Sequence, residues 1–366
     1  MYFDEFNNFK VVPPYHDGRK LLSLKDLNKE TPEIYIDTTN RTAGKTTFYN
    51  GYLVDRFLRF GEKFCLLYRK KYELEIVERT FFDDIGKIFF RGLEMISEPQ
   101  ANGTIDFLYL NQVGEKESNK KQCGYAISIG GADEIKKMSH LLSDVVRILF
   151  DEFQLESRRY LKNELQSVIS IHDSIARGAG KQTRYVPLIL VGNLLDLYNP
   201  YYEAMGISIR LDIKTNYMRG DGWVLAQGFN AEAANKIKET GFHKAFSSHD
   251  YTAVSEKKEY LFDETNNIRT DIPNRGSYIG TIASKNKKYG VRYIWECECI
   301  YVSKKPDPSW VTSVAATESD ISENSIFIKK SKLREKLEKA LHTNNLYYDS
   351  MESKKATLSL IYNKEI

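Results

Sequence analysis

Four short apolar runs in the first half of the chain set the strongest constraint on its fold. They span residues 34–36, 64–68, 147–150 and 186–191. Their residues show little alternation between apolar and polar types, which is typical of parallel strands covered by helices on both faces. Helical patterns lie between the runs, at residues 45–60, 72–85 and 159–176. The sequence therefore predicts an α/β fold with a mainly parallel sheet and flanking helices.

Two regions depart from this alternation. An Asn102-Gly103 turn between strands near residues 93–97 and 105–110 predicts a β-insert. After residue 230 the sequence predicts a helix at 231–246 and then a polar stretch. Beyond it, strands and one helix are expected at residues 277–284, 290–303, 325–329 and 331–341. We therefore predict a first domain at 1–230, a linker or lid at 231–267, and an α+β domain at 268–366.

The charge of the chain is nearly balanced, because 53 Lys and Arg face 50 Asp and Glu for a net charge of +3. This balance excludes a strongly basic, histone-like protein. Residues 268–366 hold 17 Lys and Arg against 12 Asp and Glu (+5), whereas the remaining 36 and 38 give −2. No apolar run approaches the roughly 20 residues that a membrane span needs, so no membrane association is expected.

The four cysteines are too few and too scattered to indicate a disulfide framework. We therefore expect a soluble protein of a reducing compartment. Cys297 and Cys299 form a single C-x-C. We interpret this pair as part of a packed strand, with both thiols on one face, rather than as a metal site.

A phosphate-binding loop follows the first apolar run. Residues 39–47 read Thr-Asn-Arg-Thr-Ala-Gly-Lys-Thr-Thr and lead into a helical pattern. Backbone amides at a helix N-terminus favour a phosphate, Lys45 would reach its β- and γ-groups, and Thr46 would offer a hydroxyl to Mg²⁺. Nucleotide contacts are expected from six residues: Thr42, Ala43, Gly44, Lys45, Thr46 and Thr47. Thr39 replaces the usual first glycine, so the loop is a variant.

Two consecutive carboxylates, Asp151 and Glu152, end the third apolar run. Ligands of open α/β sheets bind at the carboxyl ends of strands. There Asp151 can hold Mg²⁺ and Glu152 can polarise the attacking water. The alternative is that both acids simply cap a following helix. The phosphate loop about a hundred residues upstream favours the catalytic interpretation.

Asn193 follows the fourth apolar run, where it could sense a γ-phosphate or orient water. An Asn after a strand is also ordinary turn chemistry, so both interpretations stay open. The order of the three elements is that of an ATPase whose catalytic glutamate lies on a strand separated from the phosphate loop. This predicts a P-loop NTPase of the additional-strand, catalytic-glutamate (ASCE) type. The chain has no Asn-Lys-x-Asp, which disfavours a GTPase.

At these residues the sequence resembles the DNA-encapsidation ATPases of small, phi-29-like tailed phages, which are relatives of the large terminase subunits. An arginine inside the phosphate loop, here Arg41, is typical of these motors, and we include it among the catalytic candidates. Residues 56–74, the Phe-Asp-Glu-Phe at 150–153 and Gly192-Asn193 with Asn-Pro-Tyr at 199–201 match further family segments. The resemblance covers most of residues 33–210.

The resemblance implies a motor that uses ATP and Mg²⁺ to drive double-stranded DNA into an empty procapsid, in the host cytoplasm and at the portal vertex. A homomeric ring, expected to be a pentamer, would work with the portal, the procapsid and a scaffold RNA. In such rings an arginine of one subunit completes the neighbour's site. Arg177 falls at the family's position for it, with Lys181 and Arg184 as substitutes. A purely structural role for Arg177 at a helix C-terminus stays open.

The C-terminal domain resembles the RNase-H-like nuclease domain of larger terminases. Two-metal nucleases need about three converging carboxylates, and the strand at 277–283 carries none. Glu296, Glu298 and Asp307 remain, but the two glutamates fit a solvated strand face. We therefore predict loss of nuclease activity. The lysines of this domain would contact a phosphate backbone or form a solvated face: Lys285, Lys287, Lys288, Lys304, Lys305, Lys329 and Lys330.

Three lysines in a polar loop of the first domain are candidates for DNA contact, namely Lys116, Lys120 and Lys121. Tyr15, before the first strand, is a candidate for the adenine pocket. Two alternative functions stay open at this point. One is a P-loop helicase or a terminase with an active nuclease. The other is an assembly module that binds nucleotide without turnover.

Overall fold

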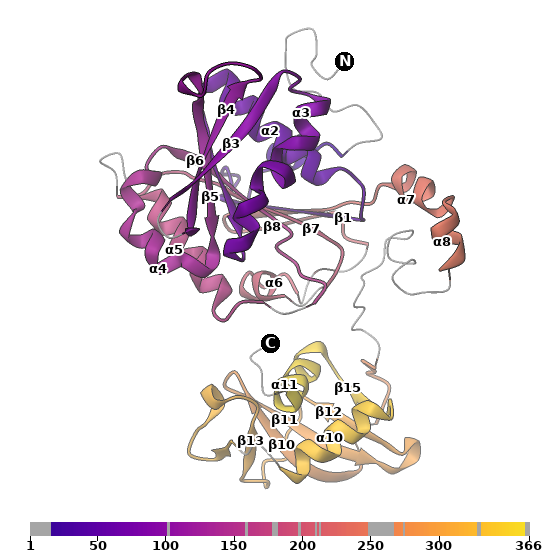
Figure 1. Ribbon diagram of the computed structural model, residues 1–366. Coiled ribbons are helices and arrows are strands. Elements are labelled where there is room, and N and C mark those ends of the chain that lie inside the picture. Colours follow the sequence, from indigo (N-terminus) through magenta and orange to yellow (C-terminus); the bar gives the residue numbers. More distant parts are fainter. Residues whose placement is uncertain are drawn as a thin grey trace. The chain divides into compact units, whose positions relative to one another are not determined.

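The computed structural model describes residues 16–100, 103–157, 160–177, 182–196, 199–208, 211, 214–247, 267–273, 275–327 and 331–362. The chain divides into two compact units, Met1–Leu261 and Phe262–Ile366. Each unit is built around its own sheet (Figure 1).

The first unit holds a nine-stranded sheet in the order β3-β4-β5-β2-β6-β7-β1-β9-β8. Its strands are β1 (Ile34–Thr39), β2 (Lys63–Tyr68), β3 (Leu93–Gln100), β4 (Ile105–Gln112), β5 (Lys121–Ser128), β6 (Val145–Asp151), β7 (Leu188–Asn193), β8 (Tyr217–Gly220) and β9 (Trp223–Gln227). The six strands from β5 to β9 in this order pair in parallel, and β3, β4 and β8 are antiparallel at the two edges. The mainly parallel sheet predicted from the apolar runs is confirmed.

Strand β7 lies between β1 and β6, so the strand that ends in Asp151 is separated from the strand that leads into the phosphate loop. This is the ASCE order predicted from the sequence. The carboxyl ends of β1, β6 and β7 meet at one edge of the sheet, because Thr39 pairs with Asn193 and Asp151 pairs with Val191. The chain thereby brings three distant segments to one place.

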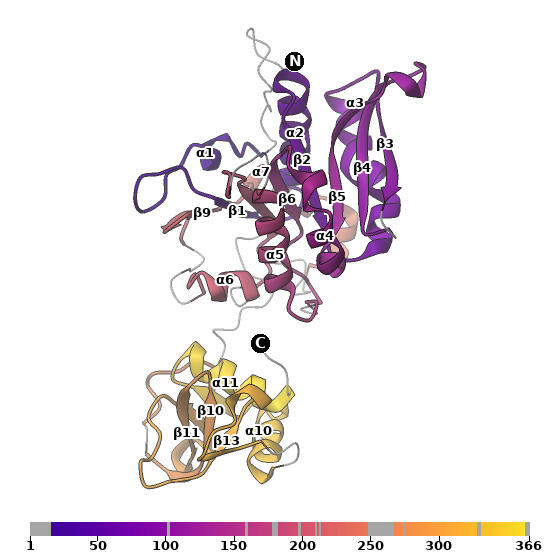
Figure 2. The same cartoon turned by 90° about the vertical axis from the view of Figure 1, so that its left-hand side faces the viewer.

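Helices cover both faces of this sheet (Figures 1 and 2). The described helices of this unit are α1 (Arg19–Leu22), α2 (Lys45–Phe60), α3 (Asp84–Ile88), α4 (Ala132–Lys137), α5 (Glu164–Ala176), α6 (Pro200–Ala204), α7 (Ala231–Lys238) and α8 (Gly241–Ala245). Residues of α1 to α6 form the cores on the two faces. Along β1, Tyr35 packs into the core under α2 and Ile36 into the core under α5. Each face of the strand is thus buried, which explains why its sequence does not alternate.

Helix α2 has the predicted bounds, with Gly44 at its N-cap and Gly61 at its C-cap, both with positive φ. The helix predicted at 72–85 is instead a 3-10 helix (Lys71–Ile76), a π-helix (Glu78–Asp83) and the short α3. The helix predicted at 231–246 breaks into α7 and α8, because the Thr240 side chain caps a new helix. Of the helix predicted at 159–176, residues 164–176 are helical.

Strands β5, β8 and β9 were not predicted. Strand β5 lies beside β2, with Gly124 opposite Phe64. A Cβ at Gly124 would come within 2.3 Å of the Phe64 carbonyl oxygen, so the close approach of the two backbones requires glycine. A charged start and an internal glycine hide this strand from a pattern search.

The second unit holds a six-stranded sheet in the order β14-β13-β10-β11-β12-β15. Its elements are β10 (Ser277–Ser284), β11 (Lys287–Ile294), β12 (Cys299–Ser303), β13 (Ser313–Ala315), β14 (Ser325–Ile326), α10 (Lys332–His342), β15 (Leu346–Tyr348) and α11 (Met351–Tyr362). Strands β10, β11 and β12 form an antiparallel meander, and β13, β14 and β15 add in parallel. Helices α10 and α11 pack on one face, as the predicted α+β class requires (Figure 1).

The strand predicted at 290–303 is wrong, because residues 295–297 form a 3-10 turn between β11 and β12. Glu298 follows it with φ 49°, a left-handed conformation that completes the reversal of the chain, so that Cys299 pairs with Ile294. The two cysteines therefore do not share a strand face: Cys297 is exposed in the turn and Cys299 is buried in β12. Helix α11 and strand β15 were not predicted.

Candidate nucleotide site

The phosphate loop turns sharply between β1 and α2. Thr39 still belongs to β1 and pairs with Asn193, so the turn begins only at Asn40. This explains why the position of the usual first glycine can hold Thr39 here. Two residues take the left-handed conformation instead, Thr42 with φ 59° and Gly44 with φ 90°. Such a left-handed residue other than glycine often marks a functional loop.

One cavity of about 360 Å³ opens at this loop. It is lined by the phosphate loop and by the ends of β6 and β7: Arg41, Thr42, Ala43, Gly44, Lys45, Thr46, Thr47, Asp151, Glu152, Gly192 and Asn193. The structure therefore brings together the loop residues, the two carboxylates and the asparagine that the sequence selected. The volume falls within the range of small-molecule sites.

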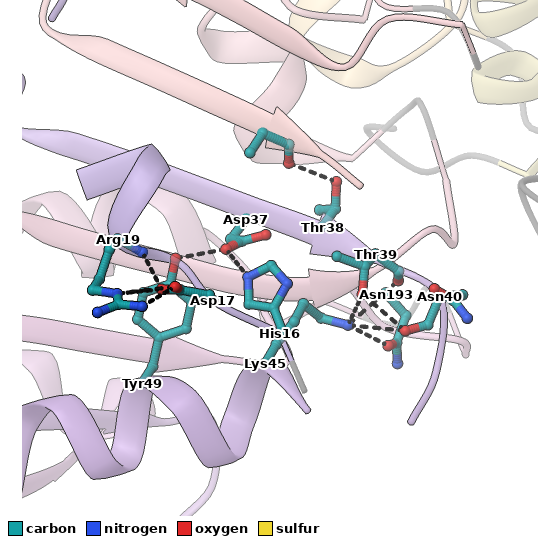
Figure 3. Close-up of polar contacts among 11 residues, drawn as sticks. His16, Asp17, Arg19, Asp37, Thr38, Thr39, Asn40, Lys45, Tyr49 and Asn193 are labelled. Carbon is teal, nitrogen blue, oxygen red and sulfur yellow. Dashed lines mark hydrogen bonds and ion pairs between the residues drawn. The ribbon is translucent and has the colours of Figure 1, made fainter. Parts of the chain in front are cut away.

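Lys45 is buried at the floor of this cavity. Its Nζ donates to Thr39 Oγ1 at 2.9 Å, to the Asn40 carbonyl at 3.2 Å and to Asn193 Oδ1 at 3.3 Å (Figure 3). Burial lowers the pKa of Lys45 to about 8, against the opposing effect of Asp37 and Asp151. Thr39, Asn40 and Asn193 thus hold the lysine at the floor of the cavity.

Thr46 and Asp151 meet across the cavity. The Thr46 hydroxyl donates to Asp151 Oδ2 at 2.6 Å. Burial raises the pKa of Asp151, and the Thr46 hydrogen bond opposes that rise. A hydroxyl and a carboxylate are the hard oxygen donors that suit Mg²⁺, which takes few protein ligands beside phosphates and water. The pair therefore fits a magnesium site, and the described residues hold no group of three or more His, Cys, Asp or Glu that could bind a metal alone.

Glu152 has an unusual backbone conformation, with φ 56° at a residue other than glycine. Its N–H donates to Asp151 Oδ1 at 2.9 Å, and its carbonyl accepts from Arg69 Nη1 at 2.6 Å. Arg69 Nη2 also donates to the Phe153 carbonyl at 2.6 Å. Arg69 therefore fixes the turn in which Glu152 lies. Glu152 does not start a helix, which argues against the helix-cap interpretation of the two acids.

A buried ion pair supports this turn from behind. Arg69 follows β2 and binds the Glu164 carboxylate of α5, and Tyr201 of α6 donates to the same carboxylate at 2.8 Å. Phe150 stacks under the guanidinium at 4.8 Å. Sequence reasoning missed Arg69, Glu164 and Tyr201 as supports of the site, because partners so far apart in the chain leave no common motif.

Comparison with known proteins identifies the family. The sequence matches the family described as podovirus DNA encapsidation protein (Gp16) over residues 25–366. The chain belongs to this podovirus DNA encapsidation family. The family resemblance noted in the sequence is thereby confirmed, as is a role in packaging phage DNA.

Similar proteins of known name agree with this family. The DNA packaging protein of Bacillus phage B103 is 22% identical over 315 residues, which cover 85% of this chain and 90% of that protein. The DNA packaging protein of Bacillus phage phi29 is 21% identical over 294 residues, covering 80% and 81%. Among solved structures, a chain of the bacteriophage phi-29 viral genome packaging motor assembly superposes with a TM-score of 0.62. It is 20% identical and covers 95% of this chain and 96% of its own.

The Phi-28 gp11 DNA packaging motor also has this fold, with a TM-score of 0.56, 16% identity, and coverage of 97% of this chain and 100% of that chain. At such identities the superpositions show the fold of the family and nothing more about individual residues. The roles of the site residues therefore rest on the geometry described above.

The arginine candidates of this family member lie in three different settings. Arg41 lines the cavity and pairs with Glu156 in the segment after β6. Arg177 is exposed just after α5 and does not line the cavity. Arg184 donates to the Ile175 and Val145 carbonyls and so caps the end of α5. Lys181 and Tyr15 lie outside the described residues.

The three lysines proposed for DNA contact surround the connection between β4 and β5. Lys116 and Lys121 are exposed. Lys120 pairs with Glu98 and stacks over the Tyr109 ring at 4.7 Å. Because Lys120 has these partners, Lys116 and Lys121 are the more available cations of the loop.

The acids left over in the second unit do not converge. Glu296 and Glu298 are exposed at the turn between β11 and β12, not on a strand face as expected. Asp307 accepts hydrogen bonds from Ser309. Lys287 and Lys304 both pair with Glu352, whereas Lys329 and Lys330 lie outside the described residues.

No helix within the described ranges is long and apolar enough to cross a membrane.

Proposed function

We propose that this chain is an ATPase and that hydrolysis in the cavity at the phosphate loop powers DNA packaging. One observation carries the proposal: Lys45, Thr46, Asp151, Glu152 and Asn193, from three segments of the chain, line a single cavity at the carboxyl edge of the sheet. This is the set that phosphoryl transfer needs for binding the phosphates, holding the metal and positioning water.

Each residue has a role that follows from its position. Residues 42–47 would bind the β-phosphate through backbone N–H groups at the N-terminus of α2. Lys45 would leave Thr39 and Asn193 for the phosphates, which frees Asn193 to contact the γ-phosphate or the attacking water. Thr46 and Asp151 would hold Mg²⁺, which when bound neutralises phosphate charge. Glu152 would accept the proton of the attacking water.

The substrate that is moved is proposed to be double-stranded DNA, and the working form a homomeric ring. Support comes from the family and from the fold shared with chains of two packaging motors. Within such a ring, which we take to be a pentamer at the portal of a procapsid in the host cytoplasm, exposed Arg177 would reach the neighbour's cavity. Its position outside its own cavity is compatible with that role. Arg184 is a weaker candidate, because its guanidinium caps α5.

The second unit is proposed to lack nuclease activity. Its first strand, β10, contains no acid, and a two-metal site needs carboxylates that converge. Its lysines, among them Lys285 and Lys288, would serve contacts with a phosphate backbone, including that of a scaffold RNA. Cleavage of plasmid DNA in Mn²⁺ would contradict this proposal and favour the terminase alternative.

The test of the proposed function measures phosphate release with and without double-stranded DNA, for the unaltered chain and for Lys45→Ala. Release that requires Mg²⁺, rises with DNA and is lost in Lys45→Ala is expected. Nucleotide binding without release, with DNA and procapsids present, would instead indicate an assembly module. Strand separation of duplex DNA would indicate a helicase.

A further inference from the structure

A buried polar cluster of His16, Asp37 and Tyr49 lies next to the phosphate loop, and none of these residues lines the cavity. Asp37, in the middle of β1, is fully buried. Its Oδ2 accepts from the Tyr49 hydroxyl at 2.6 Å and lies 2.7 Å from His16 Nε2 (Figure 3). Burial and the Asp37 carboxylate raise the pKa of Tyr49, so this hydroxyl stays a donor.

Burying the Asp37 carboxylate costs folding free energy, which suggests that the cluster has a function. Asp37 Oδ1 is buried and has no hydrogen-bond partner among the described residues. A carboxylate in this position lowers stability unless its charge is compensated. An apolar residue would suit the core of a central parallel strand better. The compensating groups are His16 from one side, Tyr49 of α2 from another, and the charge of Lys45 beyond the end of the strand.

His16 connects this cluster to the phosphate loop through its backbone. Its N–H donates to the Ala43 carbonyl at 2.9 Å. In a trans peptide the C=O and the following N–H point in opposite directions. Because the Ala43 carbonyl points at His16, the Gly44 N–H points away from His16. Ala43 and Gly44 line the cavity and His16 does not.

Two further observations show that the segment of residues 16–22 packs against α2. A Cβ at Gly18 would come within 2.5 Å of the Tyr49 hydroxyl, so the backbone passes directly over that side chain. Three residues further on, Leu21 of α1 is 2% exposed and belongs to the core under α2. The contact of His16 with Ala43 is therefore part of a docked segment.

We propose that His16 is a positioning residue for the phosphate loop: with its side chain anchored on Asp37, its backbone N–H fixes the Ala43–Gly44 peptide so that the Gly44 N–H faces the bound phosphate. The segment before β1 thereby presets an anion-binding amide that the loop would otherwise have to orient at a cost in binding free energy. This inference rests on the proposed nucleotide site and names a part of it that lies outside the loop motif.

The test compares three variants of the full chain in the same segment. His16→Ala removes the anchor, His16→Gln keeps a side-chain donor, and Asp17→Asn alters the neighbouring exposed pair of Asp17 with Arg19 as a matched control. The measurements are the dissociation constant for Mg²⁺-ADP, the KM and kcat for ATP, and the midpoint of thermal unfolding without nucleotide.

His16→Ala is expected to raise the dissociation constant and KM by about tenfold, the effect of one hydrogen bond to a charged group, while kcat at saturating ATP changes little. His16→Gln should recover most of the affinity, and Asp17→Asn should bind as the unaltered chain does. If His16→Ala unfolds before it can be assayed, His16→Phe takes its place, because it keeps a ring but loses the contact of Nε2 with Asp37. A dissociation constant about tenfold higher than that of His16→Gln then supports the inference, and an equal one overturns it. The inference is overturned if the dissociation constant rises in both His16→Ala and His16→Gln, or in neither of them.

Failure of the proposed function gives a different result. In that case the unaltered chain releases no phosphate from ATP, but as long as it binds Mg²⁺-ADP the dissociation constants still test the role of His16. Normal binding by the unaltered chain together with normal binding by His16→Ala overturns only the role of His16.

Discussion

The two units of this chain use their sheets in opposite ways. In the first unit the parallel strands β1, β6 and β7 end at one edge, where Thr39, Asp151 and Asn193 gather. In the second unit the antiparallel meander sends neighbouring strand ends in opposite directions, and the acids Glu298 and Asp307 stay apart on exposed segments. Parallel strands thus concentrate chemistry at one edge, whereas the described part of the second unit holds no group of three or more His, Cys, Asp or Glu that could bind a metal.

The largest expected difference concerns the carboxylates of the two units. Asp151→Asn should lower DNA-stimulated phosphate release at least about a hundredfold, because a metal that stabilises phosphate charge contributes several kcal/mol. Asp307→Asn, the matched control in the second unit, should leave the rate within about twofold. Steady-state rates at saturating Mg²⁺-ATP measure both. A large loss in Asp307→Asn would contradict the division of roles.

Buried and exposed ion pairs give a second comparison. Arg69→Met leaves the buried Glu164 carboxylate without its cationic partner, so the free energy of unfolding of the first unit should fall by about 3–5 kcal/mol. Lys287→Met breaks an exposed pair with Glu352 in the second unit and should cost about 0–1 kcal/mol.

Denaturant unfolding followed by tryptophan fluorescence can separate these effects. Trp223 reports on the first unit when Trp295 and Trp310 are replaced by Phe, and those two report on the second unit when Trp223 is replaced by Phe. Equal losses in the Arg69 and Lys287 variants would mean that Arg69 does not support the turn at Glu152 as described.

The pKa of Lys45 predicts that ATP affinity and the stability of the nucleotide-free chain change with pH in opposite directions. Burial lowers this pKa to about 8, so above pH 8 the lysine loses its charge and ATP affinity should fall by up to about tenfold per pH unit. The unfolded chain holds this proton up to about pH 10.4, so in the same window the contribution of Lys45 to the nucleotide-free stability should rise with pH.

Lys45→Met is the control for both signs, because it should flatten the affinity profile and remove this rise in stability. Titration of ATP binding and thermal unfolding at pH 7, 8 and 9 provide the measurements. Affinity that stays constant up to pH 9 would show that Lys45 does not carry the phosphate interaction.

The smallest expected effect concerns DNA contact by surface lysines. Lys116→Ala with Lys121→Ala should reduce the slope of log affinity against log salt by about 2, if each lysine neutralises one phosphate. Lys287→Ala with Lys304→Ala removes two lysines that pair with Glu352, and should change this slope less. Binding to a short DNA duplex at several salt concentrations tests this. The reverse ranking would assign DNA contact to the second unit.

The sequence predicted which residues would lie together at the cavity because they follow strands that are recognisable one at a time. Asp151, Glu152 and Asn193 each end an apolar run, and Gly44-Lys45-Thr46 begins a helix, so a general rule about parallel strands brings them together. The fold class follows for the same reason. Nothing comparable announces Arg69, whose partners at residues 152, 153 and 164 are far from it in sequence.

The second unit was harder to predict because its strands are short and interrupted. The segment 290–303 has the composition of one long strand, yet Glu298 with its positive φ splits it into a hairpin.

In the first unit, Asp37 carries a signal in the sequence, since a lone carboxylate within the apolar β1 has to find buried partners. Tertiary contacts of this kind decide local structure without leaving a local pattern.

The most direct test of the central claim is the hydrolysis of ATP by Glu152→Gln. The substitution keeps the size and polarity of the side chain but removes the base, so phosphate release should fall by about 10²–10⁴-fold. ATP affinity should stay close to that of the unaltered chain, because Lys45, Thr46 and the loop amides are untouched. Release at the unaltered rate by a variant that binds ATP normally would contradict the assignment of this cavity as the catalytic site.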